Sequence, residues 1–258
     1  MAAVRRLLPA ADGPPTELDD DALAEAYAVT AAIPRHLRMN FVSSADGGVT
    51  VQDRSAGLSN PADERVFALL RDLADVVLVG AGTARVEGYR AERYGPVRRR
   101  RRVELGRAEL PVIAVVSGSL DIDPTSRLFA DADPAARTVV ITRRGAPADR
   151  LAALAAVADL IVAGDDHIDL AAALDRLAER GLRRMLCEGG PTLFGALLRA
   201  GLVDELCLTV SPLLTGPGTG RIVAGPVLDG APYPLDVLHL LEEDGALLLR
   251  YTLPSRRS

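Results

Sequence analysis

The chain has 258 residues, of which 48% are hydrophobic and 25% charged, and its formal net charge is −5. These values are typical of a globular protein with a full apolar core, and the negative balance does not indicate a general affinity for nucleic acid or acidic membranes. Every basic residue is an arginine, which excludes a Schiff-base lysine and a lysine-bearing P-loop.

The two cysteines, Cys187 and Cys207, lie in apolar runs at a spacing that fits no metal motif, so we expect reduced cysteines in the core. The N-terminal stretch is too weakly apolar for a secretory signal, and no run approaches the length of a membrane span. We therefore expect a cytoplasmic protein that binds neither nucleic acid nor membranes.

Residues 1–33 are rich in Pro, Asp and Ala and contain one short helical pattern at 20–28. We interpret them as an N-terminal extension that wraps a single domain at 34–258. From residue 35 onward, short apolar runs alternate with amphipathic stretches. The apolar runs predict strands at 37–43, 76–79, 112–116, 138–142, 160–163 and 184–187. The amphipathic stretches predict helices at 61–73, 83–88, 148–157, 170–180 and 192–200.

Near-continuous Val, Ile and Leu strands that alternate with helices are typical of parallel strands covered on both faces. The helix at 61–73 has a strong start, because Asn60 can cap it and Pro61 suits the first helical position. Two further strands, at 205–212 and 246–253, are separated by a Gly/Pro-rich stretch at 216–234 and no helix. The sequence therefore predicts an α/β fold with a mostly parallel central sheet and an antiparallel C-terminal edge.

The most basic segment is VRRRRRVELGR at 97–107. One interpretation is a patch that binds phosphate or nucleic acid. Aromatic residues make up only 3% of the chain, however, so base stacking has little to work with. We therefore expect a solvated, mobile loop.

In open α/β sheets, ligands bind beyond the carboxyl ends of the strands. Two glycine-rich turns, GAGT at 80–83 and EGGPT at 188–192, follow predicted strands and open helices. Their backbone N–H groups suit a pyrophosphate, and Thr83 and Thr192 add hydroxyl donors. GAGTAR lacks the third glycine of the dinucleotide fingerprint, so an ordinary Rossmann fold is not indicated.

Three charged residues at strand ends have both a functional and a structural interpretation. Arg143, which follows Thr142, could pair with the 2′-phosphate of NADPH or be an ordinary surface arginine, and the sequence leaves both open. Asp46 could orient a substrate, but a turn-forming aspartate is the favoured interpretation. Glu188 ends an apolar strand, where a carboxylate without a partner is costly, so we favour a functional role.

The histidines His36, His167 and His239 are scattered along the chain. Neither the zinc deaminase signature nor the GxSxG nucleophile elbow is present. We expect no metal site.

The motifs occur in a specific order: SSADG at 43–47, GAGT at 80–83 with Glu87, EGGPTL at 188–193, then LVDEL at 202–206 with SPLL at 211–214. This series resembles the reductase half of the riboflavin-pathway deaminase–reductases and the related stand-alone pyrimidine reductases. The resemblance implies a dihydrofolate reductase-like fold, NADPH as cofactor, no metal and a homodimer. It also implies hydride transfer to the ribose of an aminopyrimidine ribose phosphate.

The resemblance and the strand-end argument together give a set of expected site residues. The expected catalytic residues are Glu188 and Asp46. The residues expected to hold the cofactor are Ser43, Thr83, Glu87, Ser117, Thr142, Arg143, Val162, Gly189, Gly190, Pro191, Thr192 and Leu193. The residues expected to bind the substrate are Asn40, Ser55, Arg71 and Glu188.

The chain departs from the family pattern mainly in the substrate half. Asn40 stands where a lysine is frequent, Gly48 where Arg or Lys follows Asp-Gly, and Glu87 where an aspartate is usual. The primary hypothesis is an NADPH-dependent reductase of an aminopyrimidine ribose phosphate or a related heterocycle. Two alternatives stay open, a weak dihydrofolate reductase-like enzyme and a non-catalytic NADPH-binding regulatory protein.

Overall fold

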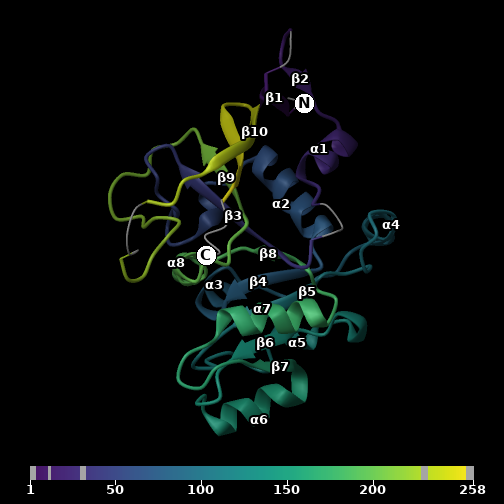
Figure 1. Ribbon diagram of the computed structural model, residues 1–258, viewed down its shortest axis with the longest axis vertical. Coiled ribbons are helices and arrows are strands. Elements are labelled where there is room, and N and C mark those ends of the chain that lie inside the picture. Colours follow the sequence, from purple (N-terminus) through teal and green to yellow (C-terminus); the bar gives the residue numbers. More distant parts are fainter. Residues whose placement is uncertain (1–3, 11–12, 30–32, 228–231, 254–258) are drawn as a thin grey trace. The chain divides into compact units, whose positions relative to one another are not determined.

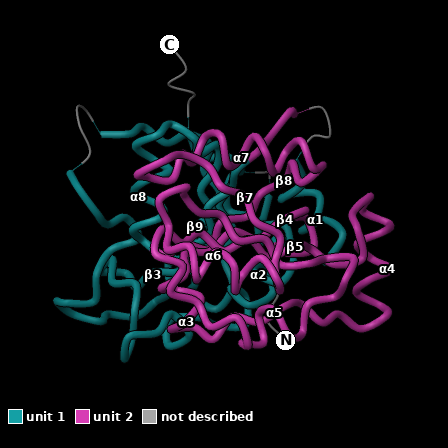
Figure 2. The backbone as a smooth tube through the Cα atoms, turned by 90° about the horizontal axis from the view of Figure 1, so that it is seen from below, with its two compact units in different colours: residues 1–31, 37–70, 191–258 teal, residues 32–36, 71–190 magenta. Residues whose placement is uncertain are grey.

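The computed structural model describes residues 4–10, 13–29, 33–227 and 232–253. The chain folds as two compact units, each assembled from segments that are distant in the sequence (Figure 2). Unit 1 comprises residues 1–31, 37–70 and 191–258, and unit 2 comprises residues 32–36 and 71–190. The N-terminal segment is thus counted within unit 1.

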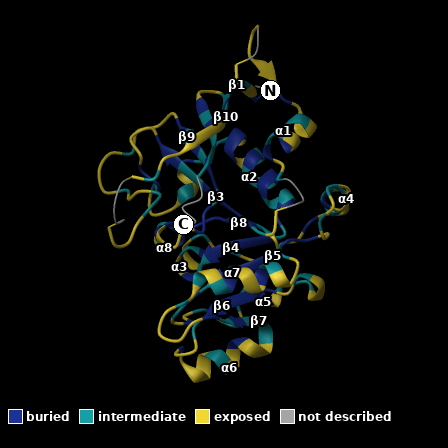
Figure 3. Ribbon diagram, viewed as in Figure 1, coloured by how far each residue is buried: buried dark blue, intermediate teal, exposed yellow. Residues whose placement is uncertain are grey.

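Unit 2 contains a parallel sheet with the strand order β8–β4–β5–β6–β7 (Figure 1). Its strands are β4 (Val76–Gly80), β5 (Val112–Val116), β6 (Val139–Thr142), β7 (Asp159–Val162) and β8 (Arg184–Cys187). The strand β4, which lies between β8 and β5, is buried along Val76–Val79, as the dark blue of Figure 3 shows. The prediction of parallel strands from near-continuous Val, Ile and Leu runs is confirmed.

The helices of unit 2 follow its strands, as expected for crossover connections between parallel strands. They are α3 (Ala81–Val86), α4 (Pro96–Glu104), α5 (Arg127–Ala130), α6 (Ala148–Val157) and α7 (Leu170–Glu179), with a short 3₁₀ turn at Pro134–Ala136. α7 illustrates why they form. Asp169 caps its first turn by accepting the Ala172 N–H at 3.0 Å, and Leu174 and Leu177 lie on its buried face.

The arginine-rich segment is a helix, and the expectation of a solvated, mobile loop was wrong. α4 begins after Gly95, with Pro96 in its first turn, where a missing N–H costs nothing. Arg102 on this helix is fully buried. The sequence pattern did not indicate this helix, because its buried residue is an arginine rather than an apolar side chain.

Unit 1 contains a second group of strands, with the order β2–β1–β10–β11–β9–β3. Their bounds are β1 (Arg5–Leu8), β2 (Thr16–Glu17), β3 (His36–Ser44), β9 (Glu205–Ser211), β10 (Asp236–Glu243) and β11 (Ala246–Thr252). β3 and β9 pair in parallel, and the other pairs are antiparallel. The predicted antiparallel C-terminal edge is confirmed.

One strand of this edge was missed, because no element was predicted between the Gly/Pro-rich stretch at 216–234 and the strand at 246–253, where β10 lies. β10 and β11 form a hairpin in which Glu243 pairs with Ala246 across Asp244 and Gly245. Both turn residues have positive φ, +50° and +82°. Asp-Gly is a strong signal for such a two-residue hairpin, and it was present in the sequence.

The helices of unit 1 are α1 (Asp20–Tyr27) and α8 (Pro191–Arg199), with a 3₁₀ turn at Ser55–Gly57 and most of α2 (Pro61–Leu73). The last turn of α2, from Arg71 on, is counted in unit 2. The predicted cap of α2 is confirmed, because Asn60 Oδ1 accepts the Asp63 N–H at 3.0 Å. The N-terminal segment adds β1 and β2 to the sheet edge beside β10.

Candidate active site

The carboxyl edge of the unit 2 sheet collects residues that the sequence placed at strand ends. Because all strands of this sheet are parallel, they end at the same edge. In strand order, this edge carries Glu188 and Gly189 after β8, Gly80 before α3, Ser117 after β5, Thr142 at the end of β6, and Val162 at the end of β7.

The turn after β8 packs against the start of α3. Gly80 donates its backbone N–H to the Gly189 carbonyl at 2.7 Å. Gly189 has a φ of +91°, a conformation that favours glycine. A Cβ atom at Gly190 would overlap Thr83 Oγ1. The first glycine is therefore required for its backbone conformation and the second for the close approach of Thr83.

Glu188 belongs to a polar cluster with Arg71, Tyr89 and Glu92, which we call the Glu188 cluster. Arg71 holds Glu188 with two bonds, Nε to Oε1 at 2.7 Å and Nη2 to Oε2 at 2.6 Å. Arg71 also pairs with Glu92, and the Tyr89 hydroxyl donates to Glu188. Arg71 comes from the last turn of α2, whereas Tyr89 and Glu92 lie in the segment after α3.

The Glu188 cluster sets two carboxylates against one guanidinium. Only 2% of the Glu188 side chain is exposed, against 18% for Arg71 and 12% for Glu92. Burial alone would lower the pKa of Arg71, but Glu188 and Glu92 raise it, so this arginine stays charged. Burial and the nearby Glu188 raise the pKa of Tyr89, so its phenol stays protonated and donates. The cluster is thus held in one arrangement, and Arg71 is the most exposed of its three charged members.

Arg143 connects the turns after β5 and β6. Its Nε donates to the Gly118 carbonyl at 3.2 Å, and its guanidinium lies close to Gly145. Within the described ranges no carboxylate pairs with Arg143, whereas Arg144 pairs with Asp165 at 2.9 Å. The charge of Arg143 is therefore available to a ligand.

Four other predicted cofactor residues lie at the same edge. Ser117 Oγ accepts the Leu120 N–H at 3.0 Å and closes its own turn. Thr142 is fully buried, and its hydroxyl has no hydrogen-bond partner in the part of the chain that the structure describes. Val162 accepts a hydrogen bond from Arg176 through its carbonyl, and Glu87 ends α3. Their roles toward a cofactor stay predictions.

Asp46 lies in unit 1 and ties the turn after β3 to the loop after β9. Its carboxylate accepts hydrogen bonds from the Ser44 hydroxyl and from the backbone N–H groups of Thr215, at 3.2 Å, and Gly216, at 2.8 Å. The Ser44 bond and these two backbone bonds hold the pKa of Asp46 well below its usual range. The turn-forming interpretation therefore has direct support in the structure.

The other predicted site residues of unit 1 are spread over three elements. Ser43 and Asn40 are buried on β3, and Ser55 begins the 3₁₀ turn before α2. Pro191, Thr192 and Leu193 form the first turn of α8, where Thr192 is exposed and Leu193 is buried.

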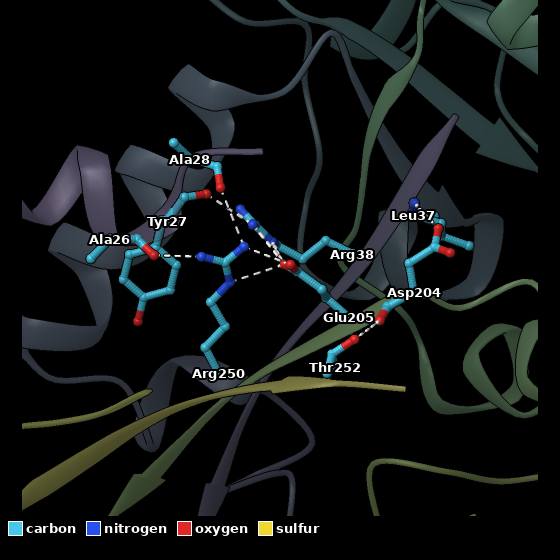
Figure 4. Close-up of polar contacts among 9 residues, drawn as sticks. All are labelled: Ala26, Tyr27, Ala28, Leu37, Arg38, Asp204, Glu205, Arg250 and Thr252. Carbon is cyan, nitrogen blue, oxygen red and sulfur yellow. Dashed lines mark hydrogen bonds and ion pairs between the residues drawn. The ribbon is translucent and has the colours of Figure 1, made fainter. Parts of the chain in front are cut away.

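Unit 1 also contains a buried ion cluster that the sequence analysis did not identify (Figure 4). In this Glu205 cluster, Arg38 Nε donates to Glu205 at 2.8 Å and Arg250 Nη2 at 2.5 Å. The side chains of Arg38, Glu205 and Arg250 are 5%, 8% and 11% exposed. The two arginines also donate to the backbone carbonyls of residues 26–28 at the end of α1. The cluster thus attaches α1 to the sheet of unit 1.

Sequence reasoning missed Tyr89, which donates to Glu188, and Glu92, which pairs with Arg71. Both residues follow the GAGT turn within a few positions, in the stretch YRAE at 89–92. A tyrosine in a chain with so few aromatic residues was the available signal. Its contact with Glu188, about a hundred residues later, follows only from the pairing of β4 with β8.

Comparison with known proteins gives one family and a consistent set of relatives. The sequence profile of the RibD C-terminal domain matches residues 35–240. The 2,5-diamino-6-ribosylamino-4(3H)-pyrimidinone 5′-phosphate reductase of Archaeoglobus fulgidus is 31% identical over 179 residues, which cover 69% of this chain and 80% of the relative. The riboflavin biosynthesis protein RibD of Mycobacterium tuberculosis is 30% identical over 182 residues, which cover 70% of this chain and 43% of RibD.

Solved structures agree with the fold. A pyrimidine reductase-like protein from Corynebacterium diphtheriae superposes with a TM-score of 0.77 and 30% identity, covering 85% of this chain and 92% of that one. The riboflavin biosynthesis reductase Rib7 of yeast, at 16% identity and a TM-score of 0.60, shares the fold. The predicted fold class, α/β with an antiparallel C-terminal edge, is confirmed.

No three or more His, Cys, Asp or Glu side chains within the described residues gather in a way that could hold a metal ion. None of the helices that the structure describes is long and apolar enough to cross a membrane.

Proposed function

We propose, on the premise that this chain belongs to the RibD C-terminal domain family, that it transfers a hydride from NADPH to the ribose of an aminopyrimidine ribose phosphate. Family membership confirms the resemblance inferred from the strand-end motifs, and with it the enzyme class, an oxidoreductase. The observation that carries the proposal is the packing of the Gly189-Gly190 turn against Thr83 at the carboxyl edge.

The residues of the carboxyl edge fit a dinucleotide, which supplies a hydride when it is bound. Gly189 has a positive φ that favours glycine, and Thr83 Oγ1 takes the place of a Gly190 side chain, so a phosphate would meet the backbone N–H groups of the turn and this hydroxyl together. Thr83 adds a hydroxyl beside this turn, and Arg143 adds a positive charge with no carboxylate partner within the described ranges. Backbone donors, a hydroxyl and a free guanidinium are the groups that phosphates prefer.

Arg143 is the residue we expect to distinguish NADPH from NADH. A guanidinium suits the 2′-phosphate that only NADPH carries. Arg143→Gln should raise the Kd for NADPH by about tenfold or more and leave the Kd for NADH nearly unchanged. Arg144→Gln is the matched control, because Arg144 already pairs with Asp165. Fluorescence titration of both cofactors measures this, and equal losses for NADPH and NADH in Arg143→Gln would remove the assignment.

The Glu188 cluster is proposed as the polar wall that meets the substrate. Because the Glu188 carboxylate is nearly fully covered, the substrate is expected to contact the cluster through Arg71 and Glu92. Glu188 and Tyr89 then fix the position of Arg71. Positioning of this kind lowers a barrier by holding the reacting groups in the productive geometry.

The residues of this chain indicate the identity of the substrate less specifically than that of the cofactor. The relatives from Archaeoglobus and Methanothermobacter are named for a pyrimidinone ribose phosphate, which favours this class for the present chain. Gly48 differs from the basic residue frequent in the family, and a Cβ there would overlap the hydroxyls of Thr215 and Thr219. These two threonines therefore occupy the space that a longer side chain would need.

The test is NADPH oxidation with the pyrimidinone ribose phosphate and, in parallel, with dihydrofolate. Turnover of the pyrimidinone supports the proposal, and faster turnover of dihydrofolate would favour the first alternative. The covered carboxylate of Glu188 is the observation that keeps the second alternative, a non-catalytic NADPH-binding protein. That alternative predicts NADPH binding without oxidation by either compound. Absence of NADPH binding at millimolar concentration would reject all three.

A homodimer remains part of the proposal. Sedimentation equilibrium of the purified chain measures the mass in solution, and a monomer across the accessible concentration range would contradict it.

A further inference from the structure

The last turn of α2 is held by arginines from α4, the helix formed by the arginine-rich segment. Arg98 Nε donates to Asp72 Oδ1 at 2.6 Å, and the Arg98 guanidinium lies 3.7 Å from the centre of the Tyr94 ring. One turn further along α4, Arg102 is fully buried. The proposed function assigns no role to this segment, although it is the most basic part of the chain.

Arg102 is bound almost entirely by backbone carbonyls. A guanidinium carries five N–H groups. In Arg102, Nη1 donates to the carbonyls of Arg71 at 2.6 Å and Asp72 at 2.9 Å, and Nη2 donates to that of Ala74 at 3.0 Å. Nε donates to the Ala108 carbonyl at 2.8 Å. The carbonyls of a last helical turn have no partners within the helix, and Arg102 supplies them.

The same residue whose carbonyl Arg102 binds carries the central side chain of the Glu188 cluster. Arg71 offers its carbonyl to Arg102 and its guanidinium to Glu188 and Glu92. The backbone of Arg71 is therefore fixed by α4, while its side chain is fixed by Glu188, directly after β8, and by Glu92. A shift of the last turn of α2 would move the base of the Arg71 side chain and misalign both of its bonds to Glu188.

We propose that Arg102 is a positioning residue for the reaction, which it serves by fixing Arg71 against Glu188. This inference rests on the proposed function, because it assumes that the substrate meets the Glu188 cluster. It gives the arginine-rich segment a role that needs neither nucleic acid nor phosphate. It also explains why an arginine is buried here, since a side chain of this length and number of donors can reach carbonyls at three positions of one turn.

The test is a double-mutant cycle between Arg102 and Arg71. In the wild-type background, Arg102→Met should lower kcat/KM for the pyrimidinone ribose phosphate by about tenfold or more, since misplaced groups are costly in catalysis. In an Arg71→Met background, the same change should lower kcat/KM by less than about twofold, because Arg102 then has no side chain to position. The Kd for NADPH should stay within about twofold throughout, because the Gly189-Gly190 turn is untouched. Arg100→Met, on the exposed face of α4, is the matched control and should leave kcat/KM unchanged.

Equal losses in both backgrounds, or no loss in the wild-type background, would overturn the proposal. Arg102→Lys keeps the charge with fewer donors, so it should give an intermediate loss, and it carries the test if Arg102→Met does not fold. A crystal structure of the Arg102 variant is the readout that does not depend on turnover. An Arg71 side chain displaced from Glu188 supports the positioning role even if the assigned substrate is wrong, and an unchanged Arg71–Glu188 pair rejects it.

Discussion

The Glu205 cluster and the Glu188 cluster use the same groups in opposite proportions. In the Glu205 cluster one carboxylate lies between two guanidiniums, whose remaining donors bind backbone carbonyls at the end of α1. In the Glu188 cluster one guanidinium lies between two carboxylates. Each carboxylate has about four acceptor sites. The Glu205 cluster therefore uses its donors within the fold. The Glu188 cluster has more acceptors than donors, and it lies at a sheet edge where ligands are expected.

The strongest way to break this comparison is to neutralise Glu205. Glu205→Gln leaves two buried arginines without their carboxylate, and the expected loss in the free energy of unfolding is about 3–5 kcal/mol. Urea unfolding measures it. The matched control is Asp20→Asn, which removes the exposed pair between Asp20 and Arg65 and should cost about 0–1 kcal/mol. Similar losses in the two variants would show that the Glu205 cluster does not stabilise unit 1 more than a surface pair does.

Acid should weaken the region of the Glu205 cluster through His239. This histidine is buried edge-on against Tyr27, with ring centres 4.7 Å apart. Burial and the neighbouring Arg250, Arg6 and Arg38 lower the pKa of His239 to about 4, although Glu205 opposes them. The unfolded chain then binds more protons than the folded one, so stability is fully present above about pH 6.5 and is lost as the pH falls toward 4, by up to about 3 kcal/mol.

Urea midpoints measured between pH 4 and pH 7.5 follow this effect. His239→Phe keeps a ring against Tyr27 and removes the titrating group, so its pH dependence over this range should be smaller than that of the wild type. An identical pH dependence in the two proteins would assign the acid sensitivity to other groups.

The Glu188 cluster should respond in activity rather than in stability. Glu188→Gln leaves Arg71 paired with Glu92, so the fold should persist, while kcat/KM should fall by about 10²-fold. Tyr89→Phe removes one donor to Glu188 and should cost about fivefold. Steady-state kinetics with NADPH titrations measure both variants. A loss of NADPH affinity as large as the loss of kcat/KM would place Glu188 in the cofactor site instead.

The smallest expected effect concerns the two cysteines, because one of them lies beside each cluster. Cys187 precedes Glu188, and Cys207 lies near Arg38 and Glu205 on β9; both are buried and free. Burial raises the pKa of Cys187 to about 12 and that of Cys207 to about 11. At pH 8 neither thiol should react with an aromatic disulfide reagent until denaturant is added. In a Cys187→Ala background, the further change Glu205→Gln should expose Cys207 at a lower urea concentration. Prompt labelling of the native protein would contradict the burial of the thiols.

The sequence predicted elements whose signal is local. Apolar runs gave the strands of unit 2, Asn60 and Pro61 gave the start of α2, and the order of the strand-end motifs gave the family. Glu188 was singled out because a carboxylate at the end of a buried strand needs a partner, and Arg71 supplies it. Apart from the order of the motifs, which spans the chain, each of these features depends on residues close together in the sequence or on one elementary cost.

Features that depend on contacts between distant segments were missed. Arg102 looked solvated, because nothing in the sequence shows that α4 lies against the last turn of α2. Arg38 and Arg250 looked like ordinary strand residues until Glu205 was found between them. The excess of arginine also concealed them, since a charged residue normally indicates solvent and only the fold shows which few are buried.

The pairing of β1 with β10 limits how far the protein can be trimmed. The match to the family begins at residue 35. Arg5 and Arg6 lie upstream of that boundary, yet they pair with Glu242 and Leu241 on β10. A chain that begins at residue 35 would lack β1, so the backbone of β10 would be exposed. It would also lack the carbonyls to which the Arg38 and Arg250 guanidiniums donate. An unpaired edge strand can pair with strands of other copies of the chain, which leads to aggregation. Shortened forms are therefore expected to precipitate, and crystallisation or labelling work should retain the N-terminal thirty residues or so.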